Sequence, residues 1–239
     1  MRRRHSDWSS TVQRLLAHVR NDGITWVPEP LGFDDSEREV LSYVEGDPGV
    51  PEGDARWSEG LLAAVARRLR EWHDSTATFV QTDEDAWFNP GRLPHEVIAH
   101  NTFADRSHIF TGDQLVGVIH FDHCYPASRL WDIAYSAYFY CPLAPPQDNV
   151  DFAGEISSPF DIATMQERLE AFLSAYGAVE LTDGTTRTYI PDEVTTMLAT
   201  RLHDMADRAD MHVDPNLRAQ VSTYRAHAFW VESGALDAW

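Results

Sequence analysis

EVIAHNTFADRSHIFTGDQLVGVIHFDHCYPASRLWDIAYSAYFYCPL, residues Glu96 to Leu143, is the stretch of the sequence that decides the fold. It begins with the apolar pair Val97 and Ile98, which predicts a short strand, and continues through a polar loop to a second expected strand at Leu115–Ile119. A His-Phe-Asp-His loop follows, and a helix is expected to open near Ser128. The polar side chains of this stretch therefore gather in its two loops.

The order and spacing of these residues resemble the catalytic core of the aminoglycoside phosphotransferase and choline kinase-like family, the small-molecule branch of the protein-kinase fold. Family members usually read HNDLAPYNxVF and then GVIDFDxAxPGPRLWDLAY. The matching residues of this chain are His100, Asn101, Ala104, Phe110, Gly117–Ile119, Phe121, Asp122, Pro126, Arg129–Asp132, Ala134 and Tyr135. The resemblance implies an α+β, protein-kinase-like fold. It assigns residues 1–47 to a reduced N-lobe of a helix, two strands and the hinge, and residues 48–239 to a mainly helical C-lobe with a degenerate catalytic loop.

Three residues depart from the family pattern at positions that carry phosphoryl transfer. Thr102 stands where relatives have the catalytic Asp, Ser107 where they have the metal-binding Asn, and His120 where they have the first metal-binding Asp. Phosphoryl transfer needs carboxylate and amide oxygens around magnesium, and a His nitrogen is a poor ligand for this hard ion. These substitutions predict that ATP- and magnesium-dependent transfer is lost, although Asp122 would still bind a metal weakly.

The N-terminal part points to the same loss. No glycine-rich phosphate-cradling motif occurs in the sequence, and all 19 basic residues counted as Lys and Arg are Arg. Relatives ordinarily carry the glycine-rich loop and a strand with a cationic anchor before the first helix, and Arg2–Arg4 would be the last remnant of that strand. The alternative is that the start of the sequence is not the native one.

Composition narrows the function classes. The net charge of −19 argues against nucleic acid and anionic membrane surfaces as partners, and no stretch approaches the length of a membrane span. Cys124 and Cys141 are the two cysteines, and no secretory segment is recognised, so a cytoplasmic protein with reduced thiols is expected. A small-molecule ligand is the expected partner, and a protein partner or a homodimer is the further possibility.

Periodicity and turn signals predict the remaining elements. A first helix is expected at Ser9–Arg20, with Ser9 or Ser10 as its N-cap, and a second helix begins after Ser58, which is its expected N-cap. Three more helices are expected at Asp161–Ala175, Asp192–Ala209 and Pro215–Ser233. Two strands are expected around the acidic turn at Asp34, with a hinge at Leu41–Gly46, and residues 144–160 are expected to form a loop that covers the cleft. By resemblance, His73 and Asp74 are structural and Asp132 braces the catalytic loop.

Five polar side chains are expected to converge where relatives have the kinase site: Thr102, Asp105, Ser107, His120 and Asp122. His120 and Asp122 are two residues apart in an expected extended segment, which would place both on one side. A His beside a carboxylate is a common acid/base pair, so His120, Asp122, Thr102 and Asp105 are the candidate catalytic residues. The residues expected to line a substrate pocket are Ser107, His123, Trp87, Tyr125 and Trp230.

No cofactor and no metal are expected, and a zinc site at His120, His123 and Cys124 is a weaker alternative.

Three functions remain open. The first is metal-free acid/base catalysis on a small molecule in specialised metabolism, by cyclisation, isomerisation, elimination or hydrolysis. The second is a non-catalytic pseudokinase that binds a ligand or partner, in which exposed C-terminal aromatic residues (Phe229, Trp230, Trp239) would matter more. The third is an atypical phosphotransferase that uses Asp122, Asp105 and an Arg.

Overall fold

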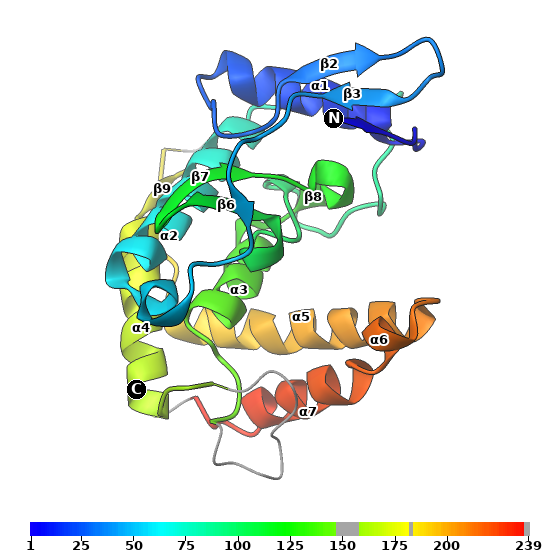
Figure 1. Ribbon diagram of the computed structural model, residues 1–239. Helices are drawn as coiled ribbons and strands as arrows, with labels where there is room; N and C mark the ends of the chain where they lie inside the picture. Colours follow the sequence, from blue (N-terminus) through cyan, green and yellow to red (C-terminus); the bar gives the residue numbers. More distant parts are fainter. Residues whose placement is uncertain (147–157, 182–183, 237–239) are drawn as a thin grey trace. The chain divides into compact units, whose positions relative to one another are not determined.

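The computed structural model describes residues 1–146, 158–181 and 184–236, which fall into two compact units, Met1–Asp132 and Ile133–Trp239 (Figure 1). The expected division after residue 47 does not coincide with this one. The backbone before residue 47 is bound to later strands of the same unit, since the Trp26 carbonyl accepts a hydrogen bond of 3.0 Å from the Val118 amide. The assignment of residues 1–47 to a reduced N-lobe stays a prediction.

The first unit begins with one helix and a small antiparallel sheet. Helix α1 (Ser9–Asn21) buries an apolar face of Val12, Leu15, Leu16 and Val19. The sheet has the order β1-β3-β2, formed by β1 (Arg2–Arg3), β3 (Glu39–Leu41) and β2 (Pro30–Phe33). The helix and the two strands around Asp34 are confirmed. The expected Ser9 or Ser10 N-cap is wrong, because Trp8 occupies that position and the Ser9 hydroxyl accepts from the Ser6 amide instead.

The rest of the first unit consists of a long helix and short strands. The elements are β4 (Asp47–Pro48), η1 (Gly53–Trp57), α2 (Glu59–Thr76), β5 (Val97–Ala99), η2 (Asp105–Ser107), β6 (His108–Thr111), β7 (Gln114–Val118), η3 (Phe121–His123) and β8 (Tyr125–Ala127). As expected, the Ser58 side chain caps α2 by accepting from the Leu61 amide. Trp72, fully buried on α2, donates to the Ile98 carbonyl of β5 at 2.9 Å and fixes the helix on this strand.

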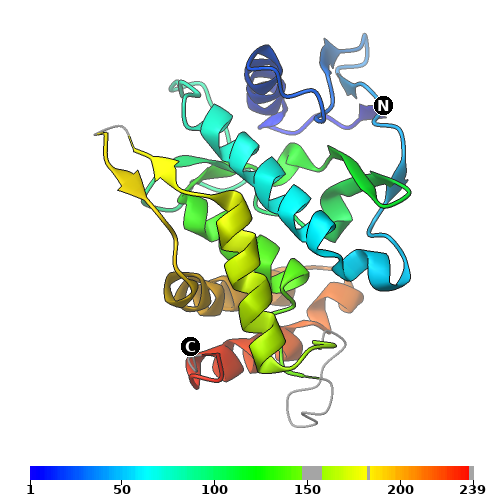
Figure 2. The same ribbon diagram turned by 90° about the vertical axis from the view of Figure 1, so that its left-hand side faces the viewer.

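The second unit is mainly helical. Helix α3 (Arg129–Tyr140) starts in the first unit and continues into the second, followed by α4 (Ile162–Tyr176), β9 (Val179–Glu180), β10 (Thr186–Arg187), α5 (Pro191–Met211), α6 (Pro215–Arg218) and α7 (Val221–Glu232). Figure 2 shows α4 running into the β9–β10 hairpin, from which the chain returns to α5. In Figure 1, α5 and α7 lie side by side.

The expected single helix at Pro215–Ser233 is broken into α6 and α7 by a turn at Ala219–Gln220. The physical reason is a local hydrogen bond, in which the Gln220 amide donates to the Leu217 carbonyl three residues back rather than continuing the α-helical pattern. The expected cover loop at 144–160 falls mostly outside the described residues. Among the described residues, the structure holds no helix that is long and apolar enough to cross a membrane.

Candidate functional site

A buried carboxylate organises the first of the two loops. Asp132, fully buried on α3, accepts hydrogen bonds from the backbone amides of His100 at 2.6 Å and Asn101 at 2.7 Å. His73 Nε2 lies 3.3 Å from the same carboxylate. The geometry agrees with the bracing role expected for Asp132 and with the structural role expected for His73.

Asn101 links this loop to the second loop. It has a left-handed backbone with φ of 68°, a conformation that Asn tolerates better than most residues. Its side-chain amide donates to the His123 carbonyl at 2.9 Å, and its side-chain carbonyl accepts from Trp131 Nε1 at 2.8 Å. Trp131 Nε1 also lies 3.0 Å from the Tyr125 hydroxyl. The expected pocket residue Tyr125 is thus buried inside this network.

The backbone at His120 differs from the expectation. His120 has φ of 68° and ψ of 45°, which is left-handed, and Phe121–His123 form a 3-10 turn rather than an extended segment. The alternation that would place His120 and Asp122 on one side therefore does not apply, and that geometric expectation is wrong. The His120 side chain is exposed to solvent.

Asp122 is held by an arginine from the beginning of the chain. Arg3, on β1, donates through Nη1 to Asp122 Oδ2 and through Nε to Glu39 Oε2, the latter at 2.6 Å. Glu39 is completely buried on β3 and also accepts from Gln13 Nε2 at 2.9 Å. Burial by itself lowers the pKa of the Arg3 guanidinium, but the hydrogen bond to Glu39 and the charge of Asp122 outweigh it and raise the pKa. Arg3 therefore stays charged between the two carboxylates.

Thr102 and Ser107 form a separate group of hydroxyls with His100. Ser107 Oγ donates to Thr102 Oγ1 at 3.2 Å, and Thr102 Oγ1 lies 3.2 Å from His100 Nδ1. His100 Nε2 lies 3.0 Å from the Ile119 carbonyl, so Nε2 carries the proton and Nδ1 is the acceptor. Burial lowers the pKa of His100 to about 4, so the ring is neutral near pH 7.

The structure brings together only part of the expected constellation. Thr102 is hydrogen-bonded to Ser107, whereas Asp122 pairs with Arg3 and Asp105 lies 3.7 Å from an Arg56 guanidinium nitrogen. Within residues 1–132, no hydrogen bond joins these three groups to one another. The roles of these residues in catalysis stay predictions.

The expected pocket residues have different environments. The exposed His123 ring packs on Phe88 with 4.5 Å between centroids, Trp87 is half-buried and 6.1 Å from Phe79, and Ser107 is buried. Trp230 belongs to the second unit and is 4% exposed, so the expectation of an exposed Trp230 is wrong. Phe229 is exposed, and Trp239 lies outside the described residues. That these residues line a substrate pocket stays a prediction.

Cys124, one of the weaker zinc candidates, is fully buried. Burial raises the pKa of the Cys124 thiol well above its ordinary value, and the charges of Asp132 and Asp122 act in the same direction. A protonated buried thiol is a poor nucleophile and a poor metal ligand. In the part of the chain that the structure describes, no group of three or more His, Cys, Asp and Glu side chains is placed to hold a metal ion.

Comparisons with known proteins establish the fold. A choline/ethanolamine kinase family protein from Mesorhizobium loti superposes with a TM-score of 0.55 and 15% identity, over 98% of this chain and 82% of that chain. The chain has the choline kinase and aminoglycoside phosphotransferase-like fold. This kinase-like fold is also found in Plasmodium vivax ethanolamine kinase, with a TM-score of 0.53 and 10% identity over 96% of this chain and 71% of that chain. A spectinomycin phosphotransferase in complex with ADP and spectinomycin has a TM-score of 0.48, with 9% identity over 95% of this chain and 83% of that one.

Sequence comparison adds one partial relative of this kinase-fold chain. It is 38% identical over 82 residues to the trifolitoxin immunity protein of Rhizobium leguminosarum bv. trifolii. The match covers 34% of this chain and 30% of that protein, so less than a third of the immunity protein is represented. No family model matches the chain.

Sequence reasoning missed the central role of Arg3 and Glu39. The signal for Arg3 is present in the sequence, because Arg2–Arg4 stand where the resemblance predicts a remnant of the strand with the cationic anchor. The structure places Arg3 on a strand that pairs with β3, antiparallel, with Arg3 opposite Glu39. The signal for Glu39 was weak, since a single Glu in a short strand next to an acidic turn is expected at the surface.

Proposed function

We propose that this kinase-fold chain binds a small molecule without magnesium-dependent phosphoryl transfer and that it acts as a protein of the toxin-immunity type. One observation carries the proposal: the Asp122 carboxylate is engaged by Arg3, and Arg3 is fixed from behind by the buried Glu39. Such a protein has lost phosphotransfer and keeps the scaffold that binds the ligand.

The ion pair at Asp122 disfavours magnesium. Mg²⁺ requires near-octahedral oxygen coordination, and a carboxylate that already bonds a guanidinium would have to release it first. Glu39 opposes that release, because departure of Arg3 would leave a buried carboxylate without a cation. By resemblance to the family, Thr102, Ser107 and His120 remove the other oxygen groups that would hold magnesium and orient an acceptor.

The partial relative supports the proposed role in toxin immunity. Its name states immunity to trifolitoxin, and its 82 matching residues are 38% identical to this chain. A protein that binds a toxin in a preformed site provides immunity without chemistry, by lowering the free toxin concentration. The braced loops around His100, Asn101 and His123 provide a rigid frame for such a site.

Metal-free acid/base catalysis at His120 is the second candidate. The observation that favours it is the left-handed backbone at an exposed His120, because unusual backbone conformations of non-glycine residues cluster at functional sites. Asp122 would act in this reaction only after it separates from Arg3. In this second function the same ligand site binds the small molecule and also converts it to a product.

Trifolitoxin is the probe that tests these functions. The purified chain is titrated with trifolitoxin, with and without ATP and magnesium, and the recovered toxin is examined by chromatography and mass spectrometry. Binding that is independent of ATP, with the toxin recovered unchanged, is the expected result. Toxin that gains a phosphoryl group with ATP would establish a phosphotransferase, and an altered toxin without ATP would establish the catalytic alternative. Absence of binding would overturn the immunity role.

A further inference from the structure

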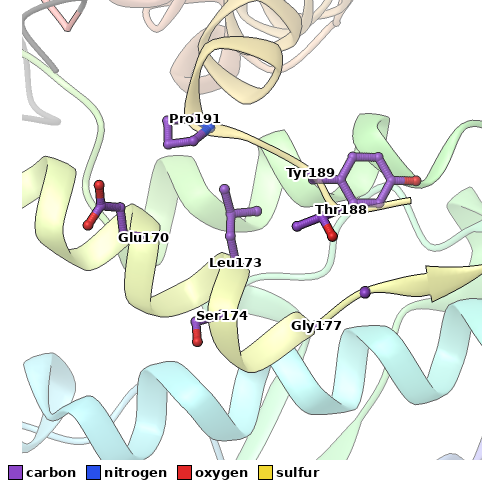
Figure 3. A pocket seen from close by; sticks show the side chains of 8 residues that line it. Glu170, Leu173, Ser174, Gly177, Thr188, Tyr189 and Pro191 are labelled. Atoms are coloured by element: carbon purple, nitrogen blue, oxygen red, sulfur yellow. The ribbon is translucent and has the colours of Figure 1, made fainter. Parts of the chain in front are cut away.

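A second candidate ligand site lies entirely within the second unit. It is a pocket of about 340 Å³, open to solvent on one side, between the last turns of α4, the segment that follows β10, and the start of α5; it is called the cavity below. Figure 3 shows Leu173 pointing from α4 toward the chain at Thr188–Pro191, with Glu170 and the Tyr189 ring at opposite ends. Its volume is at the lower end of the range of small-molecule sites, about 300 to 1,000 Å³.

The walls of the cavity are mostly apolar and held in place. Leu173, Pro191 and the ring of Tyr189 provide the apolar surface. Tyr189 is buried, and its ring packs edge-on against Tyr176 with 5.9 Å between centroids, while the Arg187 guanidinium lies 4.6 Å from the ring centroid. A wall fixed on two sides needs little rearrangement to accept an apolar group.

The charge at the cavity is negative. Glu170 is the one charged side chain among the lining residues, and among the described residues no cation forms an ion pair with it. Glu170, Leu173 and Ser174 lie on one face of α4 by their spacing of three and four residues, so the carboxylate is next to the apolar surface. An apolar cavity with a carboxylate at its rim suits a ligand with an apolar body and a positively charged end.

The neighbouring helix start does not reverse this charge preference. The N-terminus of α5 would favour an anion if its amides were free, but Pro191 has no amide hydrogen and the Ile190 amide donates to Glu193 at 3.3 Å. Asp192 and Glu193 add negative charge to this first turn. The Arg187 guanidinium lies over the Tyr189 ring and donates through Nη2 to Glu193 Oε1 at 3.4 Å, so its charge is balanced within this segment.

We propose that this cavity, lined by Glu170, Leu173 and Tyr189, binds an arylalkyl or alkyl ammonium compound, with the apolar body against Leu173 and Tyr189 and the ammonium at Glu170. The volume sets the size of the ligand, since at about 30 Å³ per water molecule it holds roughly ten waters. Phenethylamine is of about this size, and it carries the positive charge that would pair with Glu170. The site is independent of the loop site around Thr102 and Asp122, because none of its lining residues belongs to that site.

The test compares phenethylamine with its uncharged analogue 2-phenylethanol, by calorimetry and by the shifts of the Gly177 and Ala178 amide signals. Phenethylamine is expected to shift both signals and to bind more tightly than the alcohol. Glu170→Gln should weaken phenethylamine by about three- to fivefold, as for a solvent-accessible ion pair, and remove its advantage over the alcohol. The matched control Glu167→Gln, on the same helix but outside the cavity, should change neither.

A cavity-filling variant keeps the test decisive. Thr188 is exposed and lines the cavity, so Thr188→Trp should fold and block the site. Retained phenethylamine affinity in Thr188→Trp would place the amine elsewhere and overturn the proposal. The same holds if Glu170→Gln binds phenethylamine as tightly as the unchanged chain, or if the amide signals do not respond to it.

Discussion

Arg3 and Asp122 lie 119 residues apart in the sequence and form an ion pair through Arg3 Nη1 and Asp122 Oδ2. The pair connects the N-terminal strand β1 to the loop at η3, and it gives Asp122 a partner that the kinase-like resemblance did not assign. Glu39 binds the other side of the same guanidinium. The charge of Asp122 in the candidate site is therefore balanced by an arginine that is distant in the sequence.

Removing the cation of this group should destabilise the fold. Arg3→Met leaves the fully buried Glu39 without its cation, and we expect the free energy of unfolding to fall by roughly 2 to 3 kcal/mol, somewhat below the 3 to 5 kcal/mol typical of a broken buried pair because Gln13 remains bound to Glu39. Urea denaturation measures this change. Arg4→Met, at an exposed neighbouring position, is the control and should stay within about 0.5 kcal/mol of the unchanged chain.

The double variant Arg3→Met/Glu39→Gln separates the ion pair from packing. Because it removes the uncompensated buried charge, it should be more stable than Arg3→Met alone by about 1 kcal/mol or more. Equal stability of the single variant Arg3→Met and the unchanged chain would show that the pair does not form in solution.

Loss of the Asp132 carboxylate should lower the free energy of unfolding more than loss of an exposed carboxylate. Asp132→Ala leaves the buried amides of His100 and Asn101 without acceptors, and we expect a loss of about 3 to 5 kcal/mol in the free energy of unfolding. Hydrogen exchange at the Asn101 amide should accelerate in parallel. Asp113→Ala, in the exposed turn of the β6–β7 hairpin, serves as the control with an expected change below about 0.5 kcal/mol. An Asp132→Ala variant with unchanged exchange at Asn101 would contradict the brace.

The buried histidines predict a loss of stability on the acid side of neutrality. Burial lowers the pKa of His100 to about 4 and of His108 to about 3, from an ordinary value of 6.5. Below pH 6.5 the unfolded chain binds protons that the folded chain does not bind. Stability is therefore complete above this pH and falls as the pH drops toward 4, with each histidine adding a slope of up to about 1.4 kcal/mol per pH unit.

Urea denaturation at several pH values between 7.5 and 4.5 tests this slope. His108→Gln should reduce it by about 1 kcal/mol per pH unit, whatever its effect at neutral pH, because one depressed titration is removed. His203→Gln is the control, since His203 is exposed and paired with Glu232 on the surface. A slope that is the same in His108→Gln and the unchanged chain would contradict a neutral buried His108.

Both thiols should be unreactive in the folded protein. Burial raises the pKa of Cys124 well above its ordinary value and that of Cys141 to about 12, so neither forms a thiolate near pH 8. A thiol reagent should label no cysteine in the native chain and both cysteines in urea. Rapid native labelling of Cys124 would contradict the burial of this thiol.

Local signals in the sequence were sufficient for much of the fold. The apolar spacing of α1, the Ser58 cap of α2 and the Arg129–Asp132 block of α3 each act through neighbours close in sequence, which periodicity and resemblance detect. The break between α6 and α7 was missed because no Gly or Pro interrupts residues 216–233, and the turn at Gln220 depends on a single alternative hydrogen bond.

The site was less predictable than the fold for a physical reason. Alternation along an extended segment was the basis for grouping His120 with Asp122, but the backbone at His120 is left-handed and the alternation does not apply. A positive φ is uncommon for any non-glycine residue, and the enrichment of His in this conformation is too weak to predict it at one position. The Arg3–Asp122 pair is a contact between residues far apart in the chain, and only the tertiary fold brings them together. Trp230 was grouped with the exposed aromatic residues near the C-terminus, yet its side chain is buried in its unit, because only the tertiary fold decides which face of α7 is covered.

The most direct test of the central claim is calorimetric titration of the purified chain with ATP and with GTP, each with and without magnesium. Asp122 held by Arg3, with Thr102, Ser107 and His120 in place of the family's oxygen ligands, predicts no magnesium-dependent binding of either nucleotide. Binding in the micromolar range that requires magnesium would contradict this account and would make the chain an atypical phosphotransferase.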